Sequence, residues 1–156
     1  MITYVAFLRA INVAGHNIVR MSALRDAFAA AGCKNVRTYI QSGNVIFECP
    51  AEKSETIFQK IRKHVRGLIG GEPVILFRTF REIEGIVKAA PFKGLESESA
   101  IKLCVAFLSE RPRTKPKLPL VSAKEAVEAI AMNNLEVFIV SRNWSTVTKI
   151  VEFARP

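Results

Sequence analysis

Two short segments, well separated in the sequence, carry the polar side chains best suited to hold a polar or anionic ligand. The candidate ligand-binding residues are Arg9, Asn12, His16, Asn17, Gln41, Ser42 and Asn44. They combine one permanent cation with amide and hydroxyl groups that donate and accept hydrogen bonds, which is the chemistry that orients an anion. Hairpin chemistry explains Ser42 to Asn44, and Arg9 could simply pair with an acidic side chain. Turn chemistry does not explain an arginine inside an apolar segment, so we give equal weight to a ligand-binding role and to a purely structural role for these residues.

Catalytic and metal chemistry receive little support from the sequence. Only two histidines, His16 and His64, are available to activate a serine or cysteine nucleophile. The three cysteines, Cys33, Cys49 and Cys104, are widely spaced and form no C-x-x-C pair, so we predict structural thiols without a strongly lowered pKa. No metal-ligand spacing or glycine-rich phosphate loop occurs, so neither a metal nor a cofactor is expected. An enzyme of unrecognised type remains the third hypothesis for function.

The composition is that of a folded, basic protein. Hydrophobic residues make up 49% of the 156 residues, and the formal net charge is +9 at pH 7. No apolar run approaches the roughly 20 residues of a membrane-spanning helix, so no membrane association is expected. Cysteines without a disulfide pattern predict a reducing, cytoplasmic setting. The positive charge attracts acidic ligands and polyanions, although it does not identify them.

An RNA- or nucleic-acid-binding module is the alternative hypothesis. Small α+β sheets of the ferredoxin-like type can stack bases on exposed aromatic side chains. The segment Arg37 to Phe47 does not match the aromatic-rich signature of that module, and Tyr39 is its one candidate stacking platform. The basic stretch Arg111 to Lys117 can contact phosphates, but charge runs are usually solvated surface. Nucleic-acid binding is therefore not favoured over a small or acidic ligand or partner.

The first half of the chain alternates strand and helix signals. The predicted elements are a strand at 4–8, a helix capped by Ser22 and ended by Gly32, strands at 36–41 and 44–48 joined in a tight hairpin through Ser42 and Gly43, a helix capped by Ser54 and ended by Gly70 and Gly71, and a strand at 74–77. This β-α-β-β-α-β order predicts a ferredoxin-like half over residues 1–78.

The predicted topology brings the two polar segments together. A right-handed crossover between the first two strands leaves room for the third strand between them. The end of the first strand, with Arg9 and Asn12, then lies at the same edge of the sheet as the hairpin with Ser42 and Asn44. The loop Gly15 to Asn17 can fold over this edge.

Residues 79–156 predict a second α+β half. Its elements are a helix opened by a capping box at Thr79 to Glu82 and ended by Pro91, a strand at 102–108, an exposed loop at 111–117, a hairpin through Asn133 and Asn134 that we favour over a helix at 127–140, and a terminal helix from Asn143. Trp144 is a secondary ligand candidate, although packing of the terminal helix is the favoured role for it. The predicted fold class is thus α+β, with two ferredoxin-like (βαββαβ-type) halves in tandem and helices on one face of each antiparallel sheet.

Three segments carry a resemblance to a known family. They are Leu8 to Val13, Arg37 to Val45 and Asn143 to Lys149. In these segments the chain resembles an uncharacterised, mainly bacterial family known only as a domain of unknown function (DUF1697). The resemblance covers nearly the whole chain and implies two ferredoxin-like halves in tandem, but it implies no activity.

The chain departs from the family pattern in two ways. Ala10 and Ala14 stand where the family usually has glycine, so the loop after the first strand is expected to be less permissive. The family usually carries a further helix and strand where Val140 is here followed almost at once by Asn143. Either both elements are lost or a segment near 140–143 is missing, and we favour the second, because losing both would leave the second half without one covering helix and one strand. The oligomeric state and the identity of a ligand do not follow from the sequence.

Overall fold

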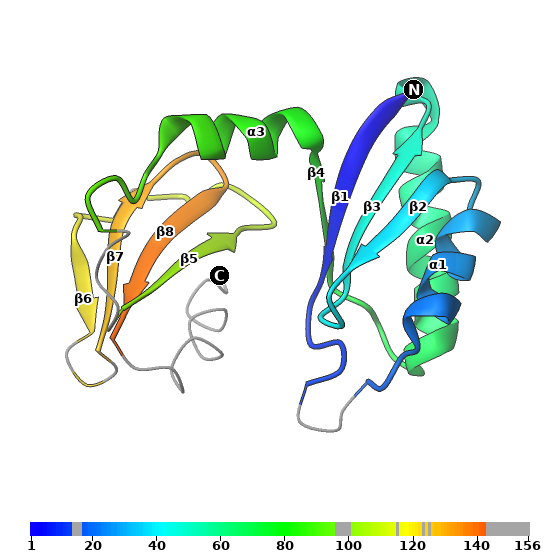
Figure 1. Ribbon diagram of the computed structural model, residues 1–156, viewed down its shortest axis with the longest axis horizontal. Coiled ribbons are helices and arrows are strands. Elements are labelled where there is room, and N and C mark those ends of the chain that lie inside the picture. Colours follow the sequence, from blue (N-terminus) through cyan, green and yellow to red (C-terminus); the bar gives the residue numbers. More distant parts are fainter. Residues whose placement is uncertain (14–16, 96–100, 115, 123, 125, 143–156) are drawn as a thin grey trace. The chain divides into compact units, whose positions relative to one another are not determined.

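The computed structural model describes residues 1–156 except 14–16, 96–100, 115, 123, 125 and 143–156 (Figure 1). The chain divides into two compact units, Met1–Gly85 and Ile86–Pro156. The class is α+β, as predicted, with two four-stranded antiparallel sheets. No helix among the described residues is both long and apolar enough to cross a bilayer.

The N-terminal unit has the strand order expected of a ferredoxin-like half. Its elements are β1 (Ile2–Leu8), α1 (Met21–Ala30), β2 (Lys34–Tyr39), β3 (Asn44–Cys49), the short 3-10 helix η1 (Ala51–Lys53), α2 (Ser54–Ile69), β4 (Ile75–Thr79) and the start of α3 (Phe80–Ala89). The sheet order is β2-β3-β1-β4 with every neighbouring pair antiparallel, so β3 lies between β1 and β2 as predicted. Helices α1 and α2 cover the same face of the sheet (Figure 1).

Strand alternation and helix periodicity build the core between this sheet and its two helices. The buried strand residues include Tyr4, Ala6, Leu8, Val45, Phe47 and Cys49, and the buried helix residues include Leu24, Phe28, Ile57, Ile61 and Val65. Phe47 lies at the centre, with its ring centroid 5.7 Å from that of Tyr4 and 5.2 Å from that of Phe28. Because side chains alternate along a strand, the residues between these core positions lie on the opposite face of the sheet, which we call the open face, although Val5 and Arg78 on it are buried.

Two predicted helix caps are wrong. Helix α1 begins at Met21 with Arg20 as its N-cap, so Ser22 lies inside the first turn. Helix α2 follows η1 directly, which makes Lys53 the N-cap, and the Ser54 hydroxyl donates a hydrogen bond to the carbonyl of Ala51 at 2.8 Å. In both places the path of the preceding chain sets the helix start, because neither serine can adopt the extended N-cap conformation inside a turn.

Other local signals are confirmed. Gly70 ends α2 in the left-handed conformation (φ 69°), and its N–H donates to the carbonyl of Arg66 at 3.0 Å. At the start of α3 the capping box is complete, since the N–H of Thr79 donates to a Glu82 carboxylate oxygen at 2.6 Å and the N–H of Glu82 donates to the Thr79 hydroxyl at 3.2 Å.

The hairpin between β2 and β3 is longer than predicted. Strand β2 ends at Tyr39, so the turn comprises the four residues 40–43 rather than a tight turn through Ser42 and Gly43 alone. Gly43 has the predicted positive φ, at 80°, but Ile40 also has a φ of 48°. Ile40 therefore belongs to the turn and not to β2. The sequence does not predict this, because a β-branched residue rarely adopts a positive φ.

The second unit contains another four-stranded sheet. It consists of β5 (Lys102–Phe107), β6 (Leu120–Ser122), β7 (Val127–Met132) and β8 (Glu136–Ser141), in the order β5-β8-β7-β6. The hairpin at Asn133 and Asn134 is confirmed, but its turn comprises residues 133–135 rather than these two alone, and the N–H of Asn133 donates to the carbonyl of Glu136 at 2.9 Å. The order β5-β8-β7 repeats β1-β3-β2 of the first unit, but the described connection between β5 and β7 carries β6, which was not predicted, and no helix like α1. The expected terminal helix, and the family elements expected between Val140 and Asn143, lie outside the described residues.

Candidate functional site

The two polar segments meet at one edge of the N-terminal sheet. The N–H of Leu8, at the end of β1, donates to the carbonyl of Gly43 at 3.0 Å, and the side-chain amide of Asn12 donates to the carbonyl of Gln41 at 3.0 Å. The loop after β1 and the turn of residues 40–43 therefore lie side by side, which is the arrangement that the topology predicts.

Asn12 holds this edge together. Besides Gln41, its amide donates to the carbonyl of Val19 at 3.0 Å, and its side-chain oxygen accepts a hydrogen bond from the N–H of Val19 at 2.8 Å. Its own N–H donates to the carbonyl of Asn17 at 3.2 Å, and the Asn17 amide donates to the carbonyl of Ala10 at 3.0 Å. Both amide hydrogens of Asn12 are thus committed to backbone carbonyls, so this side chain positions the two loops rather than facing a ligand.

Backbone strain is concentrated in the same two segments. Seven non-glycine residues have a positive φ within the described part of the chain, and four of them, Ala10, Asn12, Asn17 and Ile40, belong to the loop after β1 or to the β2–β3 turn. Ala10, where the family usually has glycine, has a φ of 55°. Such conformations persist only where surrounding contacts impose them, and they often mark functional sites.

Arg9 stands apart from this network of hydrogen bonds. Its N–H donates to the carbonyl of Val74 at 3.0 Å, which continues the strand geometry of β1 by one residue and places Arg9 on the open face. The side chain is partly buried, and its guanidinium makes no hydrogen bond or ion pair with any other described residue. The alternative that Arg9 pairs with an acidic side chain therefore finds no support within the described ranges.

The remaining candidates have different surroundings. Gln41 and Ser42 are exposed, and the Asn44 amide donates to the Ser42 hydroxyl at 2.8 Å. Gln41 contributes its carbonyl to the network through Asn12, while its exposed side-chain amide makes no hydrogen bond with another described residue. His16 and Trp144 lie outside the described residues.

Sequence reasoning missed the close approach of backbone at Gly43. A Cβ atom placed on Gly43 would lie 3.0 Å from the Cβ atoms of both Leu8 and Ile11. Ile11 is only 2% exposed and anchors the loop after β1 in the core. The hairpin glycine was recognisable by its turn position, but its packing partners come from a segment some 30 residues away in sequence, which no local signal reveals.

None of the three thiols has a lowered pKa, as predicted. Burial raises the pKa of Cys33 to about 12, and the nearby Cys49 thiol contributes to the increase. Burial also raises the pKa of Cys49 and that of Cys104. Within the part of the chain that the structure describes, no cluster of three metal-ligating side chains occurs.

The raised pKa of Cys33 predicts a loss of stability at alkaline pH. In the unfolded chain this thiol ionises with the ordinary cysteine pKa of 9.0, whereas in the folded protein it keeps its proton until about pH 12. The free energy of unfolding therefore falls with rising pH in this window, by about 1.4 kcal/mol per pH unit for one thiol. Urea unfolding at pH 8 and pH 10 should show a larger loss for the wild type than for C33A. Equal losses would contradict the assignment, since other alkaline groups affect both proteins alike.

The fold and this edge define an α+β protein whose N-terminal ferredoxin-like sheet carries two interlocked polar loops. Residues 1–138 match the model of the family described as "Protein of unknown function (DUF1697)", and the chain belongs to that family. Its fold is similar to that of the conserved bacterial protein SP0830 from Streptococcus pneumoniae, with a TM-score of 0.61 and 20% sequence identity over 96% of this chain and 81% of that one. At this identity the likeness shows the fold alone. No curated protein matches the chain.

Proposed function

We propose that this protein binds a small anionic ligand at the edge formed by the loop after β1 and the turn of residues 40–43, with Arg9 as the cation that holds it. The observation that carries the proposal is the partly buried residue Arg9, whose guanidinium has no acidic partner within the described residues. A guanidinium with no counter-charge from the protein keeps its N–H donors available, and an anionic ligand can accept charge-assisted hydrogen bonds from them.

The surrounding loops support this role because they fix the position of Arg9. The peptide of Arg9 is tied to β4 through Val74, and the Asn12 amide locks the next turn of chain onto the hairpin. A rigid backbone around a permanent charge lowers the entropy lost on binding. The exposed side chains of Gln41 and Ser42 stand at the same edge and offer neutral hydrogen-bonding groups. No reaction is assigned to the site. We also propose a reducing, cytoplasmic setting, supported by the three free cysteines.

Removal of the Arg9 charge provides the test. We expect R9Q to weaken the binding of inorganic phosphate, pyrophosphate or citrate, whichever the wild type binds best, by about tenfold to a hundredfold, because charge-assisted hydrogen bonds are lost. Isothermal titration calorimetry at low ionic strength measures this change.

R81Q is the matched control for this experiment. Arg81 is exposed on α3, has no hydrogen bond or ion pair with another described residue, and carries the same charge. R81Q should bind anions as the wild type does. Equal effects of R9Q and R81Q would mean that anions bind through the overall positive charge of the protein and not at Arg9. If the wild type binds none of these anions at millimolar concentration, the proposal is wrong.

A further inference from the structure

Tyr39 presents an aromatic ring on the same open face of the sheet as Arg9. Tyr39 pairs with Asn44 across β2 and β3, and Asn44 pairs with Phe7 across β3 and β1. Directly paired residues point to the same side of a sheet, and Asn44 alternates with the core residue Val45, so this row lies on the face opposite to the helices. Tyr39 is 65% exposed at the end of β2, where the turn of residues 40–43 begins.

The register of the sheet places Tyr39 and Arg9 on the same face, with Asn44 and Phe7 between them. Tyr39 and Phe7 are separated by two strand spacings, or about 10 Å, and Arg9 lies two residues beyond Phe7, about 7 Å further along β1. The two Cα atoms are thus roughly 12 Å apart on one face. Both side chains are long, so a molecule with a flat ring at one end and an anionic group at the other can contact both.

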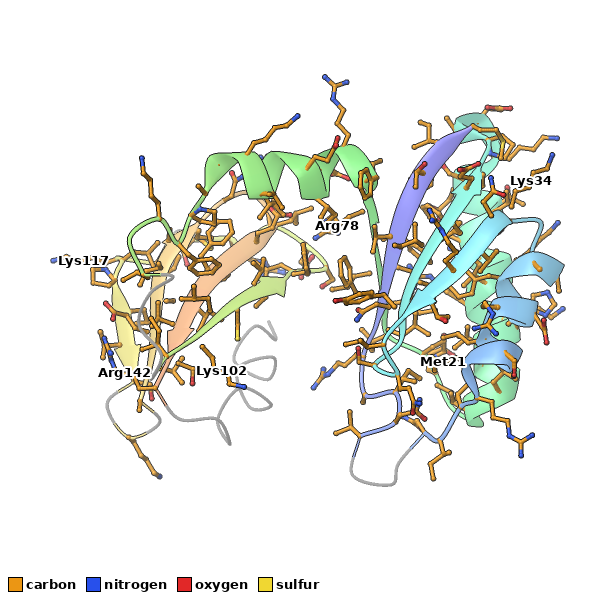
Figure 2. The ribbon with its side chains drawn as sticks, viewed as in Figure 1. Met21, Lys34, Arg78, Lys102, Lys117 and Arg142 are labelled. Carbon is orange, nitrogen blue, oxygen red and sulfur yellow. The ribbon has the colours of Figure 1, made fainter. Side chains whose placement is uncertain are left out.

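The charges on this part of the open face are positive. Arg37 lies two residues before Tyr39 on β2, opposite Ile46, and is exposed without a hydrogen bond or ion pair to another described residue. The acidic residue of this face, Glu48, stands opposite Lys34 at the other end of β2 and accepts a hydrogen bond from the Asn35 amide at 2.8 Å. Figure 2 shows Lys34 at that far end, remote from the turn of residues 40–43.

From this juxtaposition we infer that the ligand is a nucleotide, either free or as one unit of a single strand, with its base stacked on Tyr39 and its phosphate held by Arg9. This inference rests on the proposed function and specifies its ligand class. A single exposed aromatic residue needs no explanation. Here, however, an exposed aromatic ring, which can stack on a base, shares a face with two arginines that have no described partner and can bind phosphate. Arg37 adds charge beside the ring.

The experiment compares AMP with ribose 5-phosphate, which has the same phosphate and sugar but no base. In calorimetric titrations the wild type should bind AMP about tenfold more tightly than ribose 5-phosphate, because a base stacked on an aromatic ring strengthens binding. Y39L should bring this ratio close to one without changing the affinity for ribose 5-phosphate, and Y39F should retain the preference. F80L, which removes another exposed ring, is the matched control and should behave as the wild type.

The outcomes separate this inference from the proposed function. If R9Q weakens the binding of both compounds but AMP has no advantage, or if Y39L leaves the advantage intact, the nucleotide inference fails while anion binding at Arg9 stands. If R9Q has no effect on either compound, the proposed function fails. A ten-nucleotide single-stranded RNA identifies the source: tighter binding than AMP that Y39L abolishes assigns a polymer, and binding no tighter than AMP assigns a free nucleotide.

Discussion

Replacing Gly43 with alanine should lower the free energy of unfolding of the N-terminal unit by about 2–4 kcal/mol. Two effects add. The φ of 80° at this position disfavours any residue with a Cβ, by about 1–2 kcal/mol. The new Cβ would also approach the Cβ atoms of Leu8 and Ile11 to 3.0 Å, so the end of β1 and the loop after it must move away from the hairpin. Urea unfolding followed by circular dichroism measures the loss.

G70A separates these two effects. Gly70 also has a positive φ, at 69°, but a Cβ there would meet nothing within 4 Å. This variant should therefore show only the conformational part, about 1 kcal/mol. The excess loss in G43A is the contribution of close packing between the hairpin and the loop after β1. Equal losses in the two variants would mean that the loop adjusts freely and that Gly43 serves the turn alone.

The order of elements in the N-terminal unit could be predicted because it depends on local signals. Short runs of strand-forming residues marked β1 and β3, helical spacing marked α1 and α2, and Gly70 marked a helix end. The misses are places where neighbouring structure overrides local preference. Ser54 has the right chemistry for a cap, but η1 delivers the chain into α2 one residue earlier. Strand β6 has only three residues, and the segment 123–126 between it and its partner β7 contains no glycine, proline or asparagine to signal a hairpin turn.

The convergence of the two polar segments was also predictable, because strand order and direction fix which loops share an edge. Which of their residues hold the loops together, and which keep their hydrogen-bond donors available, could not be predicted. From the sequence, Asn12 and Arg9 are equally suited to bind a ligand. In the structure the Asn12 amide donates to the carbonyls of Val19 and Gln41, whereas the Arg9 guanidinium makes no hydrogen bond within the described chain. Hydrogen-bond partners depend on carbonyl positions in three dimensions, which neither residue type nor spacing determines.

Replacing Asn12 with aspartate should destabilise the same unit by about 2–4 kcal/mol at neutral pH. Aspartate has nearly the same shape and can still accept the hydrogen bond from the N–H of Val19. It has no amide hydrogens, however, so the carbonyls of Val19 and Gln41 lose their donor and instead face a negatively charged oxygen at about 3 Å. N12A loses the same bonds without the repulsion and should be destabilised less.

The comparison with a second asparagine makes this prediction specific. The Asn44 amide makes one exposed hydrogen bond to Ser42, so N44D should change stability by no more than about 0.5 kcal/mol. If Asn12 fixes the two loops, N12D should also weaken anion binding while Arg9 itself is unchanged, because a loosened loop no longer holds the guanidinium in place. Urea unfolding and calorimetric titration on the same preparations measure both effects. Should N12D unfold like N44D, the Asn12 hydrogen bonds do not hold this edge together, and the fixed geometry around Arg9 must come from β1 and β4 alone.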